Sequence, residues 1–343
     1  MPPTGQIAVI GAGSWGTALA KLLADDGKDV IMWGHRAEHI ADIDRDRENK
    51  TYLPGFSLPP NLKMTHDLKE AVSNKKNVVM VVPTHVYREV FQNVVPFLVD
   101  DTYVISASKG IENRTLLTMT RIMADVLRGS GKNIHLGVLS GPSFAREVAQ
   151  RVPTAVTVAA HHRQESLYFQ ELFFTERFRV YASNDVIGLE LGGALKNIVA
   201  IATGISDGLG YGTNTRAALI TRGLAEISKL GIKMGANPLT LSGLGGMGDL
   251  VLTCTGDLSR NRYVGLQLGR GKKIQEIIDE MNMVAEGVKT TRSAFNLAVR
   301  EGVEMPILEQ VYRILYEDKP CNDAVLSLLT RSQKEEMHHL DDT

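Results

Sequence analysis

The stretch IAVIGAGSWG, residues 7–16, decides the fold of this 343-residue chain. Its first four residues are apolar, as in a buried strand, and its glycines at Gly11, Gly13 and Gly16 match the pattern G-x-G-x-x-G. An amphipathic stretch follows and ends at Gly27, which is typical of a helix closed by a glycine cap. The sequence therefore predicts a strand, a glycine turn and a helix in succession.

Each glycine of this turn has a role in binding a dinucleotide. Gly11 permits the tight turn, Gly13 lets the backbone approach a pyrophosphate, and Gly16 lets the helix pack closely on the sheet. The helix N-terminus adds unpaired N–H groups and a partial positive charge. A glycine-rich turn without a ligand is the alternative, but the flanking strand and helix favour the dinucleotide site.

Further apolar runs recur through the first half of the chain and alternate with helical patterns. They cover residues 30–33, 78–82, 103–107, 135–139, 155–159 and 179–181. Near-continuous apolar strands separated by helices indicate a parallel sheet that is buried on both faces. We therefore expect an α/β fold with a doubly wound, Rossmann-like N-terminal domain.

Beyond Asn184 the pattern becomes helical, as Ile220, Leu224 and Ile227 illustrate. We expect a Rossmann-like domain over residues 1–185, an all-helical domain over residues 186–335 that carries the substrate and catalytic residues, and a polar tail over residues 336–343.

Composition narrows the class of protein. A net charge of -1 gives no general attraction for nucleic acid or an anionic membrane. No run approaches 18 apolar residues and no signal peptide is visible, so we expect no membrane span. We expect Cys254 and Cys321 to be reduced thiols and the protein to be cytoplasmic. We assign no metal site.

The end of the second strand bears on the choice between NAD and NADP. A carboxylate there would bind the ribose 2′-hydroxyl, but the chain has Gly34, His35 and Arg36. Arg36 could hold a 2′-phosphate or stack on adenine. His35 and Arg36 are equally well explained as solvated loop residues, so both NAD and NADP stay open.

Lys196 is the candidate catalytic residue. It lies in the segment LGGALKNI, residues 191–198, whose apolar side chains make a freely solvated charge improbable. Hydride transfer to a ketone creates an alkoxide, and a lysine with a lowered pKa can supply the proton. A lysine that snorkels at a helix edge is the alternative.

Three other segments offer groups to a small anionic substrate. Lys109 follows a strand at the edge where such sheets bind ligands, although it could be a surface lysine. The turn at residues 140–145 also follows a strand, and Ser143 in it could face the ligand or merely cap a helix. The glycine-dense run 242–249 ends in Asp249, and residues 259–261 (Ser-Arg-Asn) offer a fork suited to phosphate. A flexible loop and a solvated basic turn explain the last two segments equally well in isolation.

Together these motifs resemble bacterial NAD(P)-dependent glycerol-3-phosphate dehydrogenases. The resemblance runs from Ile7 to about Arg331 and includes GAGSWGTALA, VVPTH, SASKGIE, LSGPSFAREV, LGGALKNI, GLGGMGDLVLTC and SRNRYVG. It implies that Lys196 is the catalytic proton donor and acceptor. It implies substrate contacts from Lys109, Gly141, Ser143, Lys196, Asp249, Ser259, Arg260 and Asn261. It implies cofactor contacts from Ser14, Trp15, His35, Arg36, Lys109, Ala145, Arg260, Val284 and Glu286, besides the three glycines.

The resemblance also implies the reaction and its setting. The chain would reversibly reduce dihydroxyacetone phosphate to sn-glycerol 3-phosphate with NADH or NADPH, for glycerophospholipid synthesis. Its helical domain would resemble that of 6-phosphogluconate dehydrogenases, and it would form a homodimer. A related two-domain hydroxy-acid dehydrogenase and a non-catalytic dinucleotide sensor are the alternatives; the sensor would keep the glycine turn but would not need Lys196.

Overall fold

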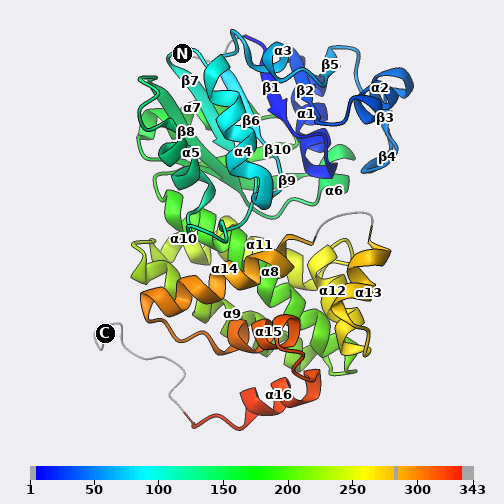
Figure 1. The fold of residues 1–343 in the computed structure, drawn as a ribbon, viewed down its shortest axis with the longest axis vertical. Helices are drawn as coiled ribbons and strands as arrows, with labels where there is room; N and C mark the ends of the chain where they lie inside the picture. Colours follow the sequence, from blue (N-terminus) through cyan, green and yellow to red (C-terminus); the bar gives the residue numbers. More distant parts are fainter. Residues whose placement is uncertain (1–4, 282–284, 334–343) are drawn as a thin grey trace.

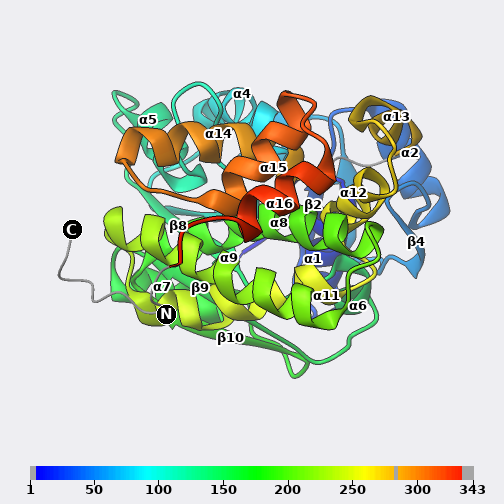
Figure 2. The ribbon, with the colours of Figure 1, turned by 90° about the horizontal axis from the view of Figure 1, so that it is seen from below.

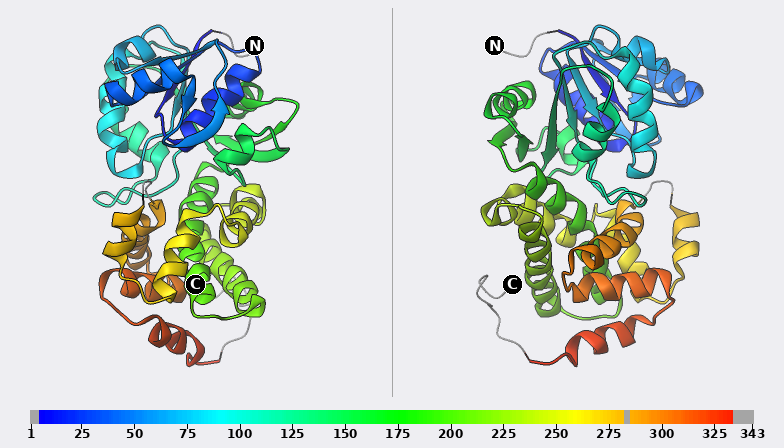
Figure 3. Two further views of the ribbon diagram at one scale, coloured as in Figure 1. Left: turned by 90° about the vertical axis from the view of Figure 1, so that its right-hand side faces the viewer. Right: turned by 60° about the vertical axis from the view of Figure 1, so that its left-hand side comes forward.

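The computed structural model describes residues 5–281 and 285–333 and has two parts, a sheet with its helices and a group of helices stacked against one end of it (Figures 1 and 3). The last strand of the sheet, β10, ends at Ser183, and the first helix of the second part, α8, begins at Val186. This architecture confirms the expected fold class. The expected tail, residues 336–343, lies outside the described residues.

Within the described residues, eight strands form the main sheet in the order β10-β9-β8-β7-β6-β1-β2-β5. They are β1 (Ile7–Ile10), β2 (Val30–Trp33), β5 (Leu62–Thr65), β6 (Asn77–Met80), β7 (Thr102–Ser106), β8 (Ile134–Ser140), β9 (Thr154–Ala160) and β10 (Phe178–Ser183). Each predicted run contributes a strand. The sequence missed β5 and the small hairpin of β3 (Glu48–Asn49) and β4 (Leu53–Ser57).

The expectation of a purely parallel sheet is wrong at one pair. β8 and β9 run antiparallel, with Val138 opposite Ala159, whereas the other strand pairs of this sheet are parallel. The helix between them, α6 (Ala145–Ala149), has five residues and spans about 8 Å, whereas a seven-residue strand spans about 23 Å. The connection therefore does not carry the chain back across the sheet, and β9 returns antiparallel.

Helices cover both faces of the sheet, so its strands are apolar on both sides. One face packs against α1 (Ser14–Asp25), α2 (Ala37–Asp46) and α7 (Arg163–Phe173). The other packs against α3 (Leu68–Val72), α4 (Thr84–Val94) and α5 (Met119–Leu127), with the short turn η1 (Val95–Phe97) after α4. In β1, Ile7 and Val9 face the first layer while Ala8 and Ile10 face the second. The predicted cap of α1 is confirmed, because Gly27 has φ +82° and Lys28 N–H bonds Leu23 O at 3.2 Å.

Helix α8 (Val186–Gly208) is the central helix of the second part; most of the other helices pack on it, whereas α13 packs on α12 and α16 packs on α15 (Figure 2). They are α9 (Thr213–Lys233), α10 (Pro238–Ser242), the π-helical turn η2 (Leu244–Gly248), α11 (Asp249–Thr255), α12 (Arg260–Gly269), α13 (Ile274–Glu280), α14 (Glu286–Glu301), α15 (Pro306–Tyr316) and α16 (Cys321–Leu329). Helix α8 is long and apolar enough to cross a membrane, but 94% of its most apolar window is buried inside the protein. Its apolar side chains are thus already covered. Cys254 and Cys321 are free thiols, as expected.

Candidate active site

The glycine turn after β1 has the geometry of a dinucleotide cradle. Gly11 has φ +129°, and a Cβ atom on it would lie 2.3 Å from the carbonyl oxygen of Val81. A Cβ atom on Gly16 would lie 1.9 Å from Gly11 O, whereas the space beside Gly13 is open. The backbone around Gly13 can therefore approach a pyrophosphate, and Gly11 and Gly16 make the turn and the helix packing possible. These residues fit the predicted cofactor.

Two predicted cofactor residues lie together beside this turn. Trp15, in the first turn of α1, shares a small apolar cluster with Ala145, the first residue of α6. The indole Nε1–H of Trp15 is buried and has no hydrogen-bond partner among the described residues. Ser14 is the first residue of α1, next to the unpaired N–H groups of the helix N-terminus. Val284 lies outside the described residues.

The end of β2 carries the residues expected at the adenosine ribose. His35 and Arg36 are exposed, and Arg36 donates to the hydroxyl oxygen of Tyr52 at 2.9 Å. The Tyr52 ring also packs edge-on against His39, with ring centroids 5.1 Å apart. Arg36 thus makes this contact across 16 residues of chain while its side chain stays exposed to solvent. No sequence motif indicated that Tyr52 would contact Arg36.

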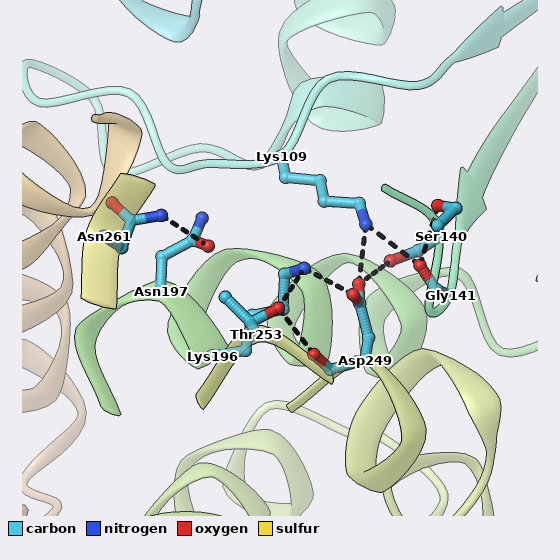
Figure 4. A network of polar contacts seen from close by, with 9 residues as sticks. Lys109, Ser140, Gly141, Lys196, Asn197, Asp249, Thr253 and Asn261 are labelled. Atoms are coloured by element: carbon cyan, nitrogen blue, oxygen red, sulfur yellow. Dashed lines mark hydrogen bonds and ion pairs between the residues drawn. The ribbon is translucent and has the colours of Figure 1, made fainter. Parts of the chain in front are cut away.

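Lys196, Asp249 and Lys109 meet in one buried centre where the two parts of the molecule face each other (Figure 4). The amine of Lys196 donates to Oδ1 of Asp249 and, at 2.8 Å, to the hydroxyl of Thr253. The amine of Lys109 donates to Oδ2 of the same carboxylate at 2.6 Å and to the carbonyl oxygen of Gly141 at 3.3 Å. The Asp249 side chain is 1% exposed, the Lys196 side chain 8% and the Lys109 side chain 17%. Lys196 is therefore no snorkelling lysine at a helix edge.

Burial and neighbouring charges set the protonation of this centre. Burial lowers the pKa of the Lys196 amine to about 8; the attraction of Asp249 opposes this shift and the Lys109 ammonium reinforces it. Burial alone would raise the pKa of the Asp249 carboxyl, but its Coulombic attraction and hydrogen bonds to Lys109 and Lys196 lower that pKa below its usual value. At neutral pH Lys196 is thus a charged acid that can release its proton readily.

Glycines let the backbone approach closely enough to form this centre. A Cβ atom on Gly192 would lie 2.5 Å from Gly245 O, and one on Gly193 would lie 2.6 Å from Ser140 Oγ. The glycine-dense run is therefore no flexible loop: residues 244–248 form η2, and Asp249 opens α11 immediately after it. This packing brings the first turns of α8 against both the end of β8 and Asp249.

The turn after β8 presents its carbonyl and hydroxyl groups to the centre. Gly141 has φ +144°, and its carbonyl oxygen accepts from Lys109 and, at 2.9 Å, from the Ser143 hydroxyl. The alternative that Ser143 caps the following helix is wrong, because the cap residue of α6 is Phe144 and no side-chain cap bond forms there. Ser143 instead stabilises the turn beside Lys109.

The predicted phosphate fork forms the N-terminus of α12. Ser259 caps this helix, with its hydroxyl oxygen accepting from Arg262 N at 3.2 Å. Arg260, the first residue of α12, is exposed; desolvation by the surrounding protein lowers the pKa of its guanidinium, and the nearby Glu286 carboxyl opposes the shift. Burial likewise raises the pKa of Glu286, whose Oε2 has no hydrogen-bond partner among the described residues. The segment is thus the capped first turn of a helix, with Ser259 buried and Arg260 exposed.

Two residues that the sequence interpretation missed belong to this site. Asn197, next to Lys196, accepts from Asn261 Nδ2 at 2.9 Å, and Asn261 Oδ1 accepts from Gly287 N at 2.9 Å. Thr253 lies one helical turn after Asp249. Its hydroxyl donates to the carbonyl oxygen of Asp249 at 2.6 Å and accepts from the Lys196 amine. The signal for both was available, because each is a polar residue in an apolar helix, next to or one turn from a predicted site residue.

The described residues contain no group of three His, Cys, Asp or Glu side chains that could hold a metal ion. A nucleotide cradle at one edge of the sheet, faced by a buried amine with a lowered pKa, defines the class of protein as a two-domain nicotinamide-dependent oxidoreductase.

Comparison with known proteins agrees and narrows the class to one family. Residues 6–166 match the model of the NAD-dependent glycerol-3-phosphate dehydrogenase N-terminus, and residues 185–326 match that of its C-terminus. The chain belongs to this family. Glycerol-3-phosphate dehydrogenase [NAD(P)+] of Citrifermentans bemidjiense is 56% identical over 96% of this chain and 98% of its own length, and that of Desulfotalea psychrophila is 57% identical over 97% and 99%. The crystal structure of glycerol-3-phosphate dehydrogenase from Coxiella burnetii superposes with a TM-score of 0.91 at 42% identity, covering 95% of this chain and 99% of that one.

Proposed function

We propose that this chain catalyses the reversible, NAD(P)H-dependent reduction of dihydroxyacetone phosphate to sn-glycerol 3-phosphate, and that it thereby supplies glycerophospholipid synthesis. The observation that carries the proposal is the buried Lys196–Asp249–Lys109 centre opposite the glycine cradle. The names of the relatives that match nearly the whole chain support this substrate over a hydroxy acid.

In the proposed mechanism, the bound nicotinamide supplies a hydride to the C2 carbonyl of the substrate. Lys196 gives its proton to the alkoxide oxygen that forms there, and Asp249 and Thr253 hold the amine in place. In the reverse direction the neutral amine accepts the proton from the C2 hydroxyl. A non-catalytic sensor would have no use for a buried amine with a lowered pKa, so this centre favours an enzyme.

The remaining predicted residues divide between the two ligands. Lys109, Gly141, Ser143, Asp249, Ser259, Arg260 and Asn261 would contact the substrate, and Lys109 and Arg260 would also contact the cofactor. Gly11, Gly13, Ser14, Trp15, Gly16, His35, Arg36, Ala145 and Glu286 would hold the cofactor. The exposed Arg260 guanidinium suits the substrate phosphate because the guanidinium and the N-terminal amides of α12 both offer donors to an anion.

The proposal extends to domains and assembly. Residues 1–185 would form the cofactor domain and residues 186–335 the substrate domain, in a cytoplasmic homodimer. Sedimentation of the purified protein tests the dimer.

The test of the activity is an absorbance assay of the reduced nicotinamide. Purified protein should consume NADH or NADPH with dihydroxyacetone phosphate and should be far less active with dihydroxyacetone at the same concentration. An R260A variant should show a raised KM for the phosphorylated substrate. Equal activity with and without the phosphate would contradict the proposed substrate, and no oxidation with either cofactor would contradict the enzyme.

A further inference from the structure

A carboxylate at the far end of α8 holds two arginines from different helices. Asp207 lies three helical turns after Lys196, and its side chain is 7% exposed. Its Oδ2 accepts from Arg262 of α12, from Nε at 2.9 Å and from Nη2 at 2.8 Å. Its Oδ1 accepts from Arg216 of α9, from Nε at 3.0 Å and from Nη2 at 2.7 Å. Asp207 therefore ties α9 and α12 to the end of α8.

Arg262 also contacts α8 through its backbone. A Cβ atom on Gly204 would lie 2.1 Å from the carbonyl oxygen of Arg262, and one on Gly265 would lie 2.0 Å from Ile201 O. Gly204 and Asp207 are three residues apart, so they lie on the same face of α8. Arg262 is thus held against α8 at its backbone and at its guanidinium, which leaves α12 little freedom to slide or rotate.

Arg262 is in turn connected to the residues proposed to bind the phosphate. It is the third residue of α12, after Arg260 and Asn261, and its N–H is the one that the Ser259 hydroxyl caps. Asn261, the residue before Arg262 in α12, donates to Asn197, which is the neighbour of Lys196 in α8. The helix pair α8–α12 therefore joins the proposed phosphate site to the proposed proton donor as one rigid unit.

We propose that Asp207 and Arg262 are positioning residues for substrate binding: by clamping the first turn of α12 to α8, they fix the position of Arg260 and its neighbours relative to Lys196. This inference rests on the proposed function. Because a small misplacement of a positioning group is costly in rate and binding, loosening the clamp should weaken binding of the phosphorylated substrate.

Arg262 acts through this clamp and not as a phosphate ligand. Its Nε and Nη2 bond Asp207 and its Nη1 bonds Asp257 at 2.9 Å, so the guanidinium is already occupied. Removing the Asp207 carboxylate distinguishes an effect of charge from an effect of position. If Asp207 acted only through its negative charge, the D207N substitution would strengthen anion binding; if Asp207 positions α12, the same substitution should weaken anion binding.

The experiment compares R262Q, R216Q and D207N with the wild type. R262Q and R216Q each remove one of the two guanidinium groups on Asp207 and the same positive charge, but R216Q leaves α12 clamped. We expect R262Q to raise the KM for dihydroxyacetone phosphate about tenfold, D207N to raise it in the same direction, and R216Q to change it less than twofold. The kcat/KM for dihydroxyacetone, which lacks the phosphate, should stay within twofold in all three. R262K, which keeps the charge but not the fork, should lie between R262Q and the wild type.

Thermal unfolding of each variant separates positioning from stability. R262Q and R216Q should lower Tm to a similar extent, since each removes one of the two ion pairs of Asp207. If KM follows Tm, so that R216Q raises it as much as R262Q, the residues have a structural role alone and the inference is overturned. A lowered KM in D207N would overturn it in favour of charge. A wild-type protein that does not turn over dihydroxyacetone phosphate would overturn the proposed function and this inference with it, whereas an active wild type with unaltered variants would overturn the inference alone.

Discussion

The pH dependence of turnover in the two directions should reveal Lys196 as the proton donor and acceptor. With its pKa lowered to about 8, the amine is about 90% protonated at pH 7 and about 10% protonated at pH 9. Reduction needs the protonated amine, so kcat/KM for dihydroxyacetone phosphate should fall roughly tenfold from pH 7 to pH 9. Oxidation needs the neutral amine, so kcat/KM for glycerol 3-phosphate should rise by about the same factor. The substrate phosphate, whose second pKa is about 6, changes little in this range.

Two variants assign the transition to this amine. In K196M the kcat of reduction should fall about 10²- to 10⁴-fold, the usual contribution of a positioned acid, and the residual activity should lose its transition near pH 8. The fold should survive, because Asp249 keeps its 2.6 Å bond to Lys109. In D249N the carboxylate no longer raises the pKa of Lys196, so the transition should move to lower pH. Initial rates from reduced-nicotinamide absorbance between pH 6.5 and 9.5 measure all of these.

One result would refute the reasoning for Lys196. If K196M keeps a transition near pH 8 in both directions, another group carries the proton, and the buried amine has a structural role. If Lys196 carries the proton, kcat/KM in the wild type should fall with pH for reduction and rise with pH for oxidation. Both dependences should be lost together in K196M.

Three further perturbations test other parts of the molecule. G16A should abolish cofactor binding, measured by quenching of protein fluorescence, because its Cβ atom would lie 1.9 Å from Gly11 O and displace the turn; unchanged affinity would exclude this turn as the cradle. R36A should raise the KM for NADPH more than that for NADH, since we propose that Arg36, which donates to Tyr52 at 2.9 Å, contacts a 2′-phosphate; equal effects would remove it from that role. Burial raises the pKa of Glu226 to about 7, although hydrogen bonds from the N-terminal amides of α15 oppose this shift. The folded protein therefore holds a proton on Glu226 that the unfolded chain releases, and the free energy of unfolding should decline by roughly 3 kcal/mol as pH rises from about 4.5 through 7. Denaturant titrations of E226Q should lack that part of the decline, and an identical pH profile in the variant would contradict the linkage.

The glycine fingerprint and the apolar runs were sufficient to predict the sheet domain, because both are local patterns. Strand β5 escaped notice because it is short and only partly apolar: Leu62 and Thr65 are buried, whereas Lys63 is exposed, and the strand lies at the edge of the sheet. The antiparallel pair β8–β9 escaped because strand direction depends on how far the connecting segment carries the chain, and apolar content does not encode that distance.

The candidate site shows the same division between local and long-range information. The sequence identified Lys196 and Asp249 as separate candidates, and chemistry suggested their roles. Their contact joins residues 53 positions apart, and the contact of Lys109 with Asp249 spans 140 positions. Periodicity carries no information at such separations. Asp207 was invisible for the same reason, since its partners lie on two other helices.

The local charge of the site favours an anionic substrate, although the net charge of the whole chain does not. Lys109 and Lys196 bring two positive charges to the single carboxylate of Asp249, so this centre retains an excess of one positive charge inside a chain whose net charge is -1. A buried excess cation is costly, and the lowered pKa of Lys196 is the expression of that cost. A phosphorylated substrate brings negative charge to the same enclosure and would therefore favour the protonated amine. The substrate that must be reduced thus promotes the protonation state in which its own alkoxide can be neutralised, and the phosphate contributes to the chemistry at C2 although it takes no part in the bond changes.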